Sequence, residues 1–524
     1  INAFNFPCWG MLEKLAPALL AGVPAIVKPA SATAHLTEAM FRQIVESGIL
    51  PPGAVQLVCG SVGDLFDHLG GGDLVSFTGS ATTAARLRAH PAVVERAVRF
   101  NAEADSLNAA VLGRSVGPDD EAFARYVDLV ATEMRVKAGQ KCTAVRRAIV
   151  PSGLVDAVVD ALGGTVAGWQ VGDPADPTTD MGPLVSLDQR REVERSCAEL
   201  SSAADPVVRP DLPAGLDTER GAWFAPTLFV ARERGAAAVH EVEAFGPVCT
   251  VIAYDTDEEA VELVARGGGS LVASLVTDDR DEAARLNTGI ASHHGRVHVL
   301  DAACAAASTG HGSPLPHLVH GGPGRAGGGE ELGGLRGVYH HMQRTAVQGS
   351  PDLLTAVTGR WMPGATRRLD RGHPFTLHFD ELEVGDALDT EARTVTIDDI
   401  EAFAELTGDH FYAHMDDEAA KASPIFEGRV AHGYFVVSAA AGLFVWPDPG
   451  PVLANYGLEN LRFATPTYPG DTLRVRFTCA EKTPRPGTGY GEVRWFTEVL
   501  NQNDEVVASY DVLTMVAESG AAAT

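Results

Sequence analysis

The chain has 524 residues, of which 45% are hydrophobic and 21% are charged, and its formal net charge at pH 7 is -28. This size and composition predict a soluble globular protein of roughly two to four domains. The negative charge argues against a nucleic-acid partner, because phosphate recognition needs a basic surface.

Cysteine usage indicates the compartment. The seven cysteines are scattered and form no CxxC pair, which predicts reduced thiols in a cytoplasmic protein. No apolar run is long enough to span a membrane, so we expect no membrane partner. The chain begins at Ile1, inside what reads as a buried strand, and we therefore expect its first domain to be truncated at the front.

Short apolar runs alternate with amphipathic stretches from Ile1 to about Val150, and a region of the same class continues to about His298. Strands that alternate with helices predict parallel α/β sheets. The glycine-dense segment 308–337 contains a formal GxGxxG at positions 322–327, but a proline precedes it and more glycines follow. It therefore predicts irregular, closely packed backbone and not a dinucleotide loop.

The character of the sequence changes after residues 349–374, which we expect to be a linker because they are rich in Pro, Gly and Arg. Residues 396–406 predict a helix that Thr396 caps, with Ile400, Phe403 and Leu406 as its apolar stripe. Alternating residues from Val493 onward predict antiparallel strands, so we expect a separate α+β domain.

Cys142 is the first candidate catalytic residue. It follows Lys141 and precedes Arg146 and Arg147, and positive charge near a thiol lowers its pKa. A single cysteine is more often a small buried hydrophobe. Its companions argue otherwise; they are Asn5 in AsnPhePro, Lys28 in LysProAla, Gly79 in PheThrGlySer, Glu103 in GluAlaAsp and Glu243 in GluAlaPheGlyProVal.

In this order and at this spacing, the segments resemble the NAD(P)-dependent aldehyde dehydrogenase superfamily over about residues 1–345. The resemblance implies that residues 1–103 are the C-terminal part of an NAD(P)-binding domain and that residues 104–348 are the catalytic domain and its tail. Cys142 would attack the aldehyde, Asn5 and the Cys142 backbone N–H would hold the oxyanion, and Glu103 would activate water.

The resemblance also implies a cofactor site. Its residues would be Lys28, Ser31, Gly79, Ser80, Glu243 and Phe245. Many members of the superfamily carry Glu where this chain has Ser31, and an acid there would repel a 2′-phosphate. NADP is therefore the expected cofactor.

A second set of residues lies in the C-terminal part, where segments 406–416 and 430–434 contain Asp409, His414 and Gly433. They resemble the (R)-specific enoyl-CoA hydratases of the MaoC-like hot-dog family over about residues 375–516. The resemblance implies a hot-dog domain over 375–524. Asp409 and His414 would handle a water molecule and its proton, and the Gly433 N–H would polarise a thioester carbonyl. The alternative is a helix cap beside a surface histidine.

Together the two sets resemble the bifunctional ring-opening enzymes of aerobic phenylacetate degradation. This resemblance implies acyl-CoA substrates, namely oxepin-CoA and the semialdehyde formed from it, and a homo-oligomer. An anionic substrate needs a local basic patch to steer it, to which Arg146, Arg147 or Arg485 are the candidates. No metal is expected, because the paired histidines at 293–294 and 340–341 lack ligand spacing.

Three alternatives stay open from the sequence. The same layout suits another acyl-CoA aldehyde. A dehydrogenase whose C-terminal domain only binds acyl-CoA is the second reading, and a non-catalytic scaffold is the third.

Overall fold

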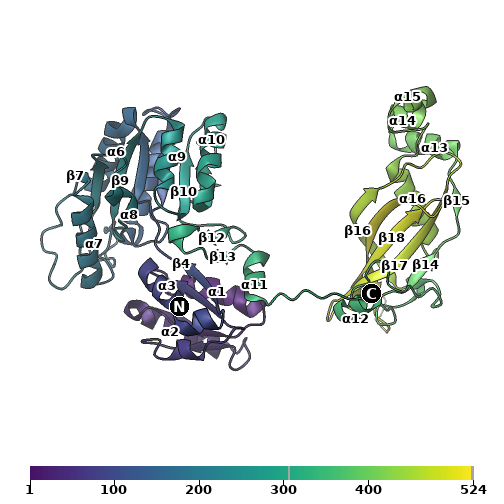
Figure 1. Ribbon diagram of the computed structural model, residues 1–524, viewed down its shortest axis with the longest axis horizontal. Helices are drawn as coiled ribbons and strands as arrows, with labels where there is room; N and C mark the ends of the chain where they lie inside the picture. Colours follow the sequence, from purple (N-terminus) through teal and green to yellow (C-terminus); the bar gives the residue numbers. More distant parts are fainter. Residues whose placement is uncertain (305–306, 521–524) are drawn as a thin grey trace. The chain divides into compact units, whose positions relative to one another are not determined.

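The structure is a computed structural model that describes residues 1–304 and 307–520. The chain forms two compact units, Ile1–Arg344 and Thr345–Thr524 (Figure 1). Among the described helices, none combines the length and low polarity that a membrane crossing needs.

The first unit is built around a seven-stranded sheet in the described part of the chain, with the order β11-β10-β5-β6-β9-β8-β7. All neighbouring strands are parallel except β7 and β8. The strands are β5 (Ala109–Leu112), β6 (Arg147–Pro151), β7 (Ala204–Val208), β8 (Thr227–Ala231), β9 (Val248–Tyr254), β10 (Ser270–Val276) and β11 (His294–Leu300). The expectation of a parallel α/β sheet is confirmed.

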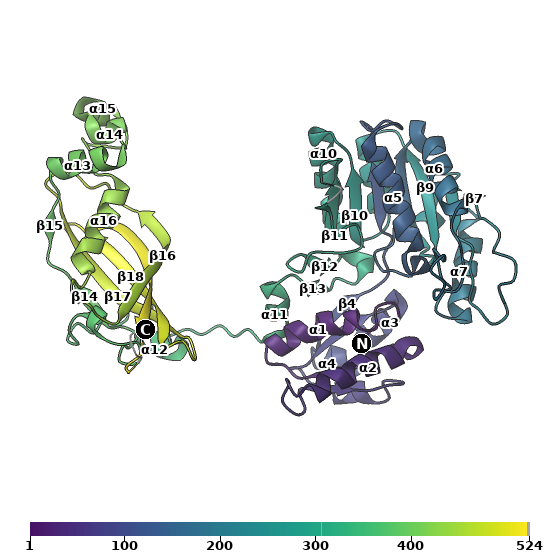
Figure 2. The ribbon, with the colours of Figure 1, turned by 180° about the vertical axis from the view of Figure 1, so that it is seen from behind.

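Helices cover both faces of this sheet, and successive strand residues therefore enter different cores. Val111 and Ile149 belong to one hydrophobic cluster, whereas Ala110 and Ala148 belong to the other. Helices α5 and α6 cover the face turned to the viewer in Figure 2, and α9 and α10 cover the opposite face. The helices of this part are α5 (Glu121–Arg135), α6 (Val155–Ala167), α7 (Leu187–Leu200), α8 (Ala237–Glu241), α9 (Asp257–Ala265) and α10 (Arg280–Ile290), with the 3-10 turns η3 (Val136–Gly139), η4 (Ser152–Leu154) and η5 (Ala291–His293).

The N-terminal part of this unit contains two short parallel strand pairs, β1 with β2 and β3 with β4. In the second pair Thr78 lies beside Glu103, so both strands end at the same edge. The elements are α1 (Trp9–Leu20), β1 (Ala25–Val27), η1 (Ser31–Thr33), α2 (Ala34–Glu46), β2 (Val55–Leu57), η2 (Leu65–His68), β3 (Leu74–Thr78), α3 (Ala81–Arg88), α4 (Pro91–Glu95) and β4 (Arg99–Glu103).

The glycine-dense segment forms the hairpin of β12 (Val319–Gly321) and β13 (Glu330–Leu332), with η7 (Gly324–Ala326) between the strands and α11 (Leu335–His341) after them. A Cβ at Gly322 would lie 2.2 Å from the Ser270 carbonyl oxygen, and one at Gly327 would lie 2.4 Å from that of Ala102. Real Cβ atoms do not approach so closely, so the segment needs glycine to pack. The expectation of closely packed backbone is confirmed.

The second unit is an antiparallel sheet in the order β14-β17-β18-β19-β16, with β15 paired to β17. Helix α16 packs against β17, and the ring of Phe477 in β17 stacks on Phe444 of the helix and on Trp495 of β18. The elements are α12 (Pro351–Thr358), η8 (Pro374–Thr376), β14 (Ala387–Asp389), β15 (Arg393–Thr394), α13 (Ile397–Thr407), α14 (Tyr412–Met415), α15 (Asp417–Ala422), α16 (Gly433–Phe444), β16 (Val452–Phe463), β17 (Thr472–Pro484), β18 (Tyr490–Leu500) and β19 (Val506–Ala517).

The structure bears on two expectations for this unit, the helix that begins at Thr396 and the segment 349–374. Thr396 caps α13 in a capping box as predicted, and Ile400 is buried, but Leu406 is 81% exposed, so its assignment to the buried stripe is wrong. The helix extends one turn past the surface it packs on. Residues 349–374, expected to be a linker, contain α12, and Trp361 within them stacks on Phe496.

Candidate active sites

Cys142 lies in the turn between η3 and β6, and two buried side chains fix this turn. The Asn108 side-chain amide donates to the carbonyl oxygens of Cys142 and Ala144 at 2.8 and 3.1 Å. The Arg146 guanidinium donates to the carbonyl oxygens of Gly139 and Lys141 at 2.9 and 3.2 Å. The nucleophile candidate is therefore held rigidly from both sides.

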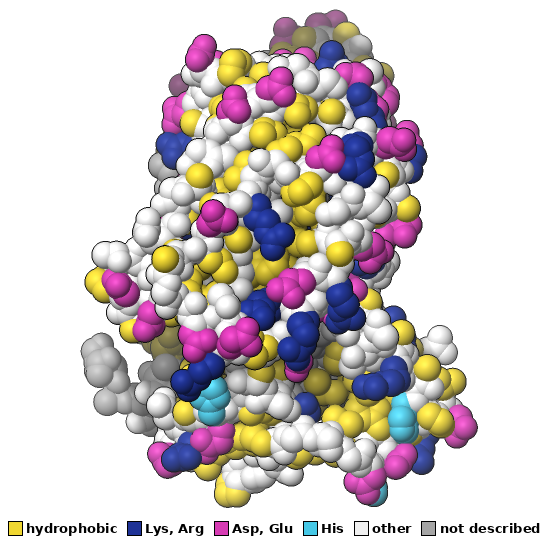
Figure 3. All heavy atoms as spheres, turned by 90° about the vertical axis from the view of Figure 1, so that its left-hand side faces the viewer, with side chains coloured by type: hydrophobic (Ala, Val, Ile, Leu, Met, Phe, Trp, Pro, Cys, Tyr) yellow, Lys and Arg dark blue, Asp and Glu magenta, His cyan; other side chains and the backbone are white. Residues whose placement is uncertain are grey.

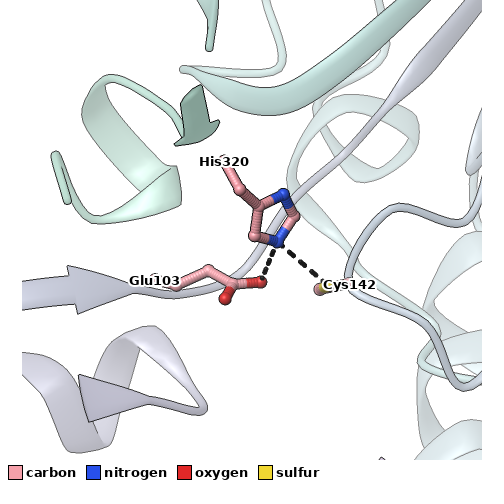
Figure 4. A group of neighbouring side chains, drawn as sticks. All are labelled: Glu103, Cys142 and His320. Carbon is pink, nitrogen blue, oxygen red and sulfur yellow. Dashed lines mark hydrogen bonds and ion pairs between the residues drawn. The ribbon is translucent and has the colours of Figure 1, made fainter. Parts of the chain in front are cut away.

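A histidine that the sequence analysis did not select joins Cys142 to Glu103 (Figure 4). His320 extends from the middle of β12, and its Nε2 lies 3.1 Å from the Glu103 Oε1 and 3.9 Å from the Cys142 Sγ. Glu103 ends β4 and is only 2% exposed. The three side chains thus meet around one nitrogen atom although they lie far apart in the sequence.

Burial and charge set the protonation of this cluster. Burial alone would raise the pKa of Glu103, but the neighbouring His320 outweighs it and lowers that pKa to about 2. Burial would lower the pKa of His320, and the Glu103 carboxylate instead raises it to about 9. Burial, and then the charge of Glu103, raise the pKa of the Cys142 thiol well above its usual range.

The prediction that Lys141, Arg146 and Arg147 supply positive charge to the Cys142 thiol is wrong. The Lys141 ammonium is paired with Glu133 at 2.8 Å. The Arg146 and Arg147 guanidinium groups are buried and bind backbone carbonyl oxygens. Because they are buried, Arg146 and Arg147 also cannot steer an anionic substrate. Arg485, the third residue predicted to steer the substrate, is paired with Glu492 at 2.8 Å.

A cavity of about 400 Å³ gives access to the cluster. Asn5, the candidate oxyanion ligand, lines it together with Glu103, Cys142 and His320. The structure therefore brings the three predicted catalytic residues of this unit together. Lys137 lines the cavity as well and lies over the Phe6 ring at 3.3 Å.

Further buried charges lie next to this cluster. The Lys14 ammonium lies 3.1 Å from the Glu331 carboxylate and 3.3 Å from Glu13. Burial raises the pKa of Glu331 to about 8, although Lys14 opposes the shift. Glu13, Glu103 and Glu331 have carboxylate oxygens within 4.8 Å of one another. The cluster is therefore surrounded by acidic groups with one lysine between them.

Four of the predicted cofactor residues lie at strand ends, where dinucleotides bind in α/β folds. Lys28 follows β1, and Ser31 begins η1 with an exposed side chain. Gly79 follows β3, and a Cβ there would lie 2.7 Å from the Phe77 ring. Ser80 caps α3. The glycine keeps this turn close to the sheet and leaves its backbone accessible.

Glu243 and Phe245 lie between β8 and β9. The Glu243 Oε2 accepts a bond from the Ser106 N–H at 3.0 Å, while its buried Oε1 has no hydrogen-bond partner among the described residues. The same oxygen lies 3.8 Å from the Arg146 Nε, too far for a hydrogen bond. A buried carboxylate oxygen without a hydrogen bond fits a ligand hydroxyl, such as that of a ribose. Phe245 lies edge-on to Phe4 at 5.8 Å. Burial raises the pKa of Glu243 to about 7.

The predicted site of the second unit is also assembled. Asp409 follows the last turn of α13, and His414 lies in α14. The His414 Nδ1 lies 2.6 Å from the Val430 carbonyl oxygen. Because a carbonyl oxygen only accepts, Nδ1 carries the proton and Nε2 of the neutral ring has a free lone pair. His414 is thereby prepared to act as a base.

His432 is a second residue that sequence analysis missed. It precedes α16, is 1% exposed, and its Nε2 donates to the Asp409 carbonyl oxygen at 2.9 Å. Its Nδ1 is buried without a partner among the described residues. Gly433 begins α16, so its N–H has no acceptor within the helix, and a Cβ there would lie 2.6 Å from the Phe463 ring. The predicted thioester ligand is therefore a helix N-terminal amide.

Donor atoms gather closely enough for a metal ion around Glu103 in the first unit and around Asp409 in the second. Four of these side chains, Glu103, Cys142, Asp409 and His414, have acid–base or nucleophilic roles in the chemistry that the sequence implies. The expectation of no metal stays a prediction.

Comparisons with known proteins agree with this arrangement. Residues 1–347 match the model of the aldehyde dehydrogenase family, and residues 380–499 match the model of the MaoC like domain. The chain is 53% identical to Protein MaoC of Klebsiella aerogenes over 307 residues, which are 58% of this chain and 90% of that protein. It is 49% identical to the 3,4-dehydroadipyl-CoA semialdehyde dehydrogenase of Aromatoleum evansii over 62% of this chain and 64% of that enzyme.

Solved structures resemble the first unit. Lactaldehyde dehydrogenase from Escherichia coli aligns with a TM-score of 0.56 and 25% identity over 65% of this chain and 67% of its own. Betaine aldehyde dehydrogenase from Staphylococcus aureus, solved in complex with NAD+, aligns with a TM-score of 0.57 and 26% identity over 65% and 64%. The chain thus spans about two thirds of these enzymes. It belongs to the aldehyde dehydrogenase family and carries a MaoC-like domain behind that region.

Proposed function

We propose that the chain is a bifunctional ring-opening enzyme. Its second unit adds water to oxepin-CoA and opens the ring to an aldehyde, and its first unit oxidises this semialdehyde to 3-oxo-5,6-dehydrosuberyl-CoA with NADP. The observation that carries the proposal is that each unit assembles its own reactive set. Cys142 and Glu103 share one cavity, and Asp409 lies beside His414. The relative from Aromatoleum evansii is named for a CoA-linked semialdehyde, which supports the substrate class.

In the first unit the Cys142 thiol releases its proton to water, and its sulfur forms a bond to the aldehyde carbon. The Asn5 amide and the Cys142 N–H stabilise the negative charge that develops on the oxygen. NADP, when bound, supplies the hydride acceptor. Glu103 then takes a proton from the water that cleaves the Cys142 thioester and releases the acid. The short reach from Glu103 through His320 to the sulfur supports these roles.

In the second unit the free lone pair of the His414 Nε2 takes the proton of the attacking water, and Asp409 orients that water. Asp409 and His414 together return a proton to carbon. The Gly433 N–H binds the thioester carbonyl at the start of α16, where the helix dipole favours negative charge. Ring opening follows when the hydrated ring releases its aldehyde.

For the cofactor we propose NADP held by Lys28, Ser31, Gly79, Ser80, Glu243 and Phe245. The Glu243 Oε1, which has no hydrogen bond among the described residues, fits a ribose hydroxyl. Exposed Ser31 adds no negative charge where a 2′-phosphate would approach Lys28. This combination supports NADP over NAD.

The test uses oxepin-CoA and NADP and follows ring opening and NADPH separately. We expect both in the wild type, ring opening without NADPH in Cys142→Ala, and neither in Asp409→Asn. Supplying the semialdehyde directly should restore NADPH formation in Asp409→Asn. Absence of turnover in the wild type would reject oxepin-CoA as the substrate. Ring opening by Asp409→Asn at the wild-type rate would mean that the second unit only binds acyl-CoA.

One alternative has a specific observation behind it. The 49% identity to a 3,4-dehydroadipyl-CoA semialdehyde dehydrogenase favours a different CoA-linked semialdehyde as the substrate of the first unit. A panel of CoA semialdehydes compared by kcat/KM separates the two candidates. Preference for the dehydroadipyl compound would replace the suberyl assignment.

The partners follow from the chemistry and from the surface. The net charge of -28 does not form a continuous acidic surface on the face in Figure 3, where Lys and Arg side chains lie among Asp and Glu. We also propose a cytoplasmic location, because all seven cysteines are free thiols, which suit a reducing compartment.

We further propose a homo-oligomer. Strand β16 is the last strand of its sheet and exposes four large apolar side chains, Leu453, Tyr456, Leu458 and Phe463. An apolar edge strand invites pairing with another chain. Light scattering should give a multiple of the 55.1 kDa chain mass, and Leu458→Glu should lower it. A wild-type mass of one chain would contradict the proposal.

A further inference from the structure

The geometry points to His320 as a positioning residue of the dehydrogenase site. Its imidazolium lies between Glu103 and Cys142 and lets a carboxylate base and a thiolate nucleophile occupy one buried cavity. The inference rests on the proposed function, because it concerns the same chemistry. It adds a residue from β12 to a site otherwise built from the segment before α1, from β4 and from the turn before β6.

The position of the His320 ring is the first observation. Its Nε2 lies 3.1 Å from the Glu103 Oε1 and 3.9 Å from the Cys142 Sγ, so one N–H is directed at both groups (Figure 4). The side chain of His320 is 11% exposed and that of Glu103 is 2% exposed. Water therefore screens neither contact well, and the ion pair keeps most of its strength.

The surrounding charge is the second observation. Glu13 from α1 and Glu331 from β13 face the cluster in addition to Glu103. The Lys14 ammonium is paired with Glu331 and Glu13, and Lys141 is paired with Glu133. A thiolate formed on Cys142 thus meets the negative charges of Glu13, Glu103 and Glu331. Lys137 lines the same cavity, and the buried Arg146 binds backbone carbonyl oxygens. The His320 imidazolium is the cation that lies 3.9 Å from the sulfur.

The pairing also divides the work of the Glu103 carboxylate. Its Oε1 is bound by His320, whereas its Oε2 has only a long contact of 3.4 Å to the Thr78 hydroxyl. The Oε2 lone pairs are therefore available for the proton of a water molecule. By binding Oε1, His320 fixes which carboxylate oxygen remains free to act as the base.

The experiment measures alkylation of Cys142 by iodoacetamide as a function of pH, read by mass spectrometry of the peptide that contains Cys142. It compares wild type, His320→Gln and the control His317→Gln, which changes an exposed histidine three residues away. Without the cation the thiol pKa should rise by about one unit, so the alkylation rate at pH 7 should fall about tenfold in His320→Gln. His317→Gln should match the wild type.

The pH dependence distinguishes charge from structure. The pKa of His320 is raised by Glu103 to about 9, so the wild type carries the cation below that pH and loses it above. The rate ratio of wild type to His320→Gln should therefore shrink towards one above about pH 10. A ratio that stays constant across the whole range would mean a purely structural role and would overturn the inference, and so would identical profiles.

A further variant tests the coupling between His320 and Glu103, and alkylation itself is independent of the proposed activity. In Glu103→Gln, where the carboxylate is neutral, adding His320→Gln should change the rate less than it does in the wild type; an equal effect would contradict the coupling. Alkylation needs neither acyl-CoA nor cofactor, so loss of the oxepin-CoA assignment leaves this test intact. Conversely, turnover of oxepin-CoA with unchanged alkylation in His320→Gln would reject only the role of His320.

Discussion

His414 and His432 stack with their ring centroids 3.8 Å apart, and a backbone carbonyl oxygen fixes one nitrogen of each ring. The Val430 carbonyl binds the Nδ1 of His414, and the Asp409 carbonyl binds the Nε2 of His432. The two tautomers are therefore defined. Burial, and then the neighbouring His432, also lower the pKa of His414, which keeps it neutral and basic near pH 7.

Replacing His432 tests whether this stack matters for hydration. In His432→Phe the Asp409 carbonyl loses its donor while the aromatic contact is kept, so Asp409 is less well oriented. We expect the kcat of ring opening to fall about tenfold, which corresponds to the loss of roughly one buried hydrogen bond. NADPH formation from supplied semialdehyde should stay unchanged. His410→Gln, which alters an exposed histidine of the same loop, is the control; equal rates in both variants would count against the stack.

Cofactor choice should depend on Ser31. A Ser31→Glu variant places a carboxylate on the exposed start of η1, where it repels a 2′-phosphate. We expect the ratio of kcat/KM for NADP to that for NAD to fall about tenfold or more, with little change for NAD itself. Ser31→Gln adds similar bulk without charge and should cause a smaller change. An unaltered ratio in Ser31→Glu would remove this residue from the phosphate site.

The affinity for NADP should depend on pH through Glu243. Burial raises the pKa of this carboxyl to about 7, so it is mostly protonated at pH 6 and mostly ionised at pH 8. The ionised form accepts the stronger hydrogen bond from a ribose hydroxyl. We expect the Kd, measured by calorimetry, to decrease about fivefold between these values. Glu243→Gln should bind with a Kd that varies much less; a wild-type Kd independent of pH would exclude this contact.

The same raised pKa affects stability in a defined direction. The folded protein holds the Glu243 proton up to about pH 7, whereas the unfolded chain releases it around 4.5. This contribution to the free energy of unfolding is thus fully present below about 4.5 and is lost as the pH rises through 7. Glu243→Gln should flatten that part of the stability curve.

Asn108 should be needed for both stability and nucleophile placement. Asn108→Ala leaves the carbonyl oxygens of Cys142 and Ala144 without their donors in a buried environment. We expect the free energy of unfolding to decrease by roughly 1–3 kcal/mol in urea titrations. Dehydrogenase kcat should fall more than ring opening, which occurs in the other unit. An equal loss of both activities would indicate general unfolding instead.

Much of this molecule was predictable because its signals are local. The alternation of apolar runs and glycine turns indicated parallel sheets, and Thr396 indicated the start of α13. The order of Asn5, Glu103 and Cys142 along the chain pointed to one site before their proximity was known. These signals depend on residue type and spacing, which the sequence states directly.

The rest depends on contacts between distant segments. His320 lies 217 residues from Glu103, inside a glycine-dense stretch that resembles a loop, so no spacing rule selects it. The prediction that basic residues next to Cys142 in the sequence also surround its sulfur was wrong for the same reason. Arg147 is directed into the interior towards the Leu107 carbonyl, and its proximity to the sulfur along the chain says nothing about its direction.

The hairpin of β12 and β13 limits how this gene can vary. Any single-base change of a glycine codon that alters the residue introduces a Cβ, and at Gly327 and Gly329 that atom would meet the Ala102 carbonyl oxygen at 2.4 and 2.3 Å. Displacing Ala102 displaces Glu103, the proposed base, which follows it. Between them, Gly328 has a left-handed backbone but open space around it, so aspartate, which one base change can give, is the tolerable replacement there. Within three consecutive codons, variation should be confined to the middle one.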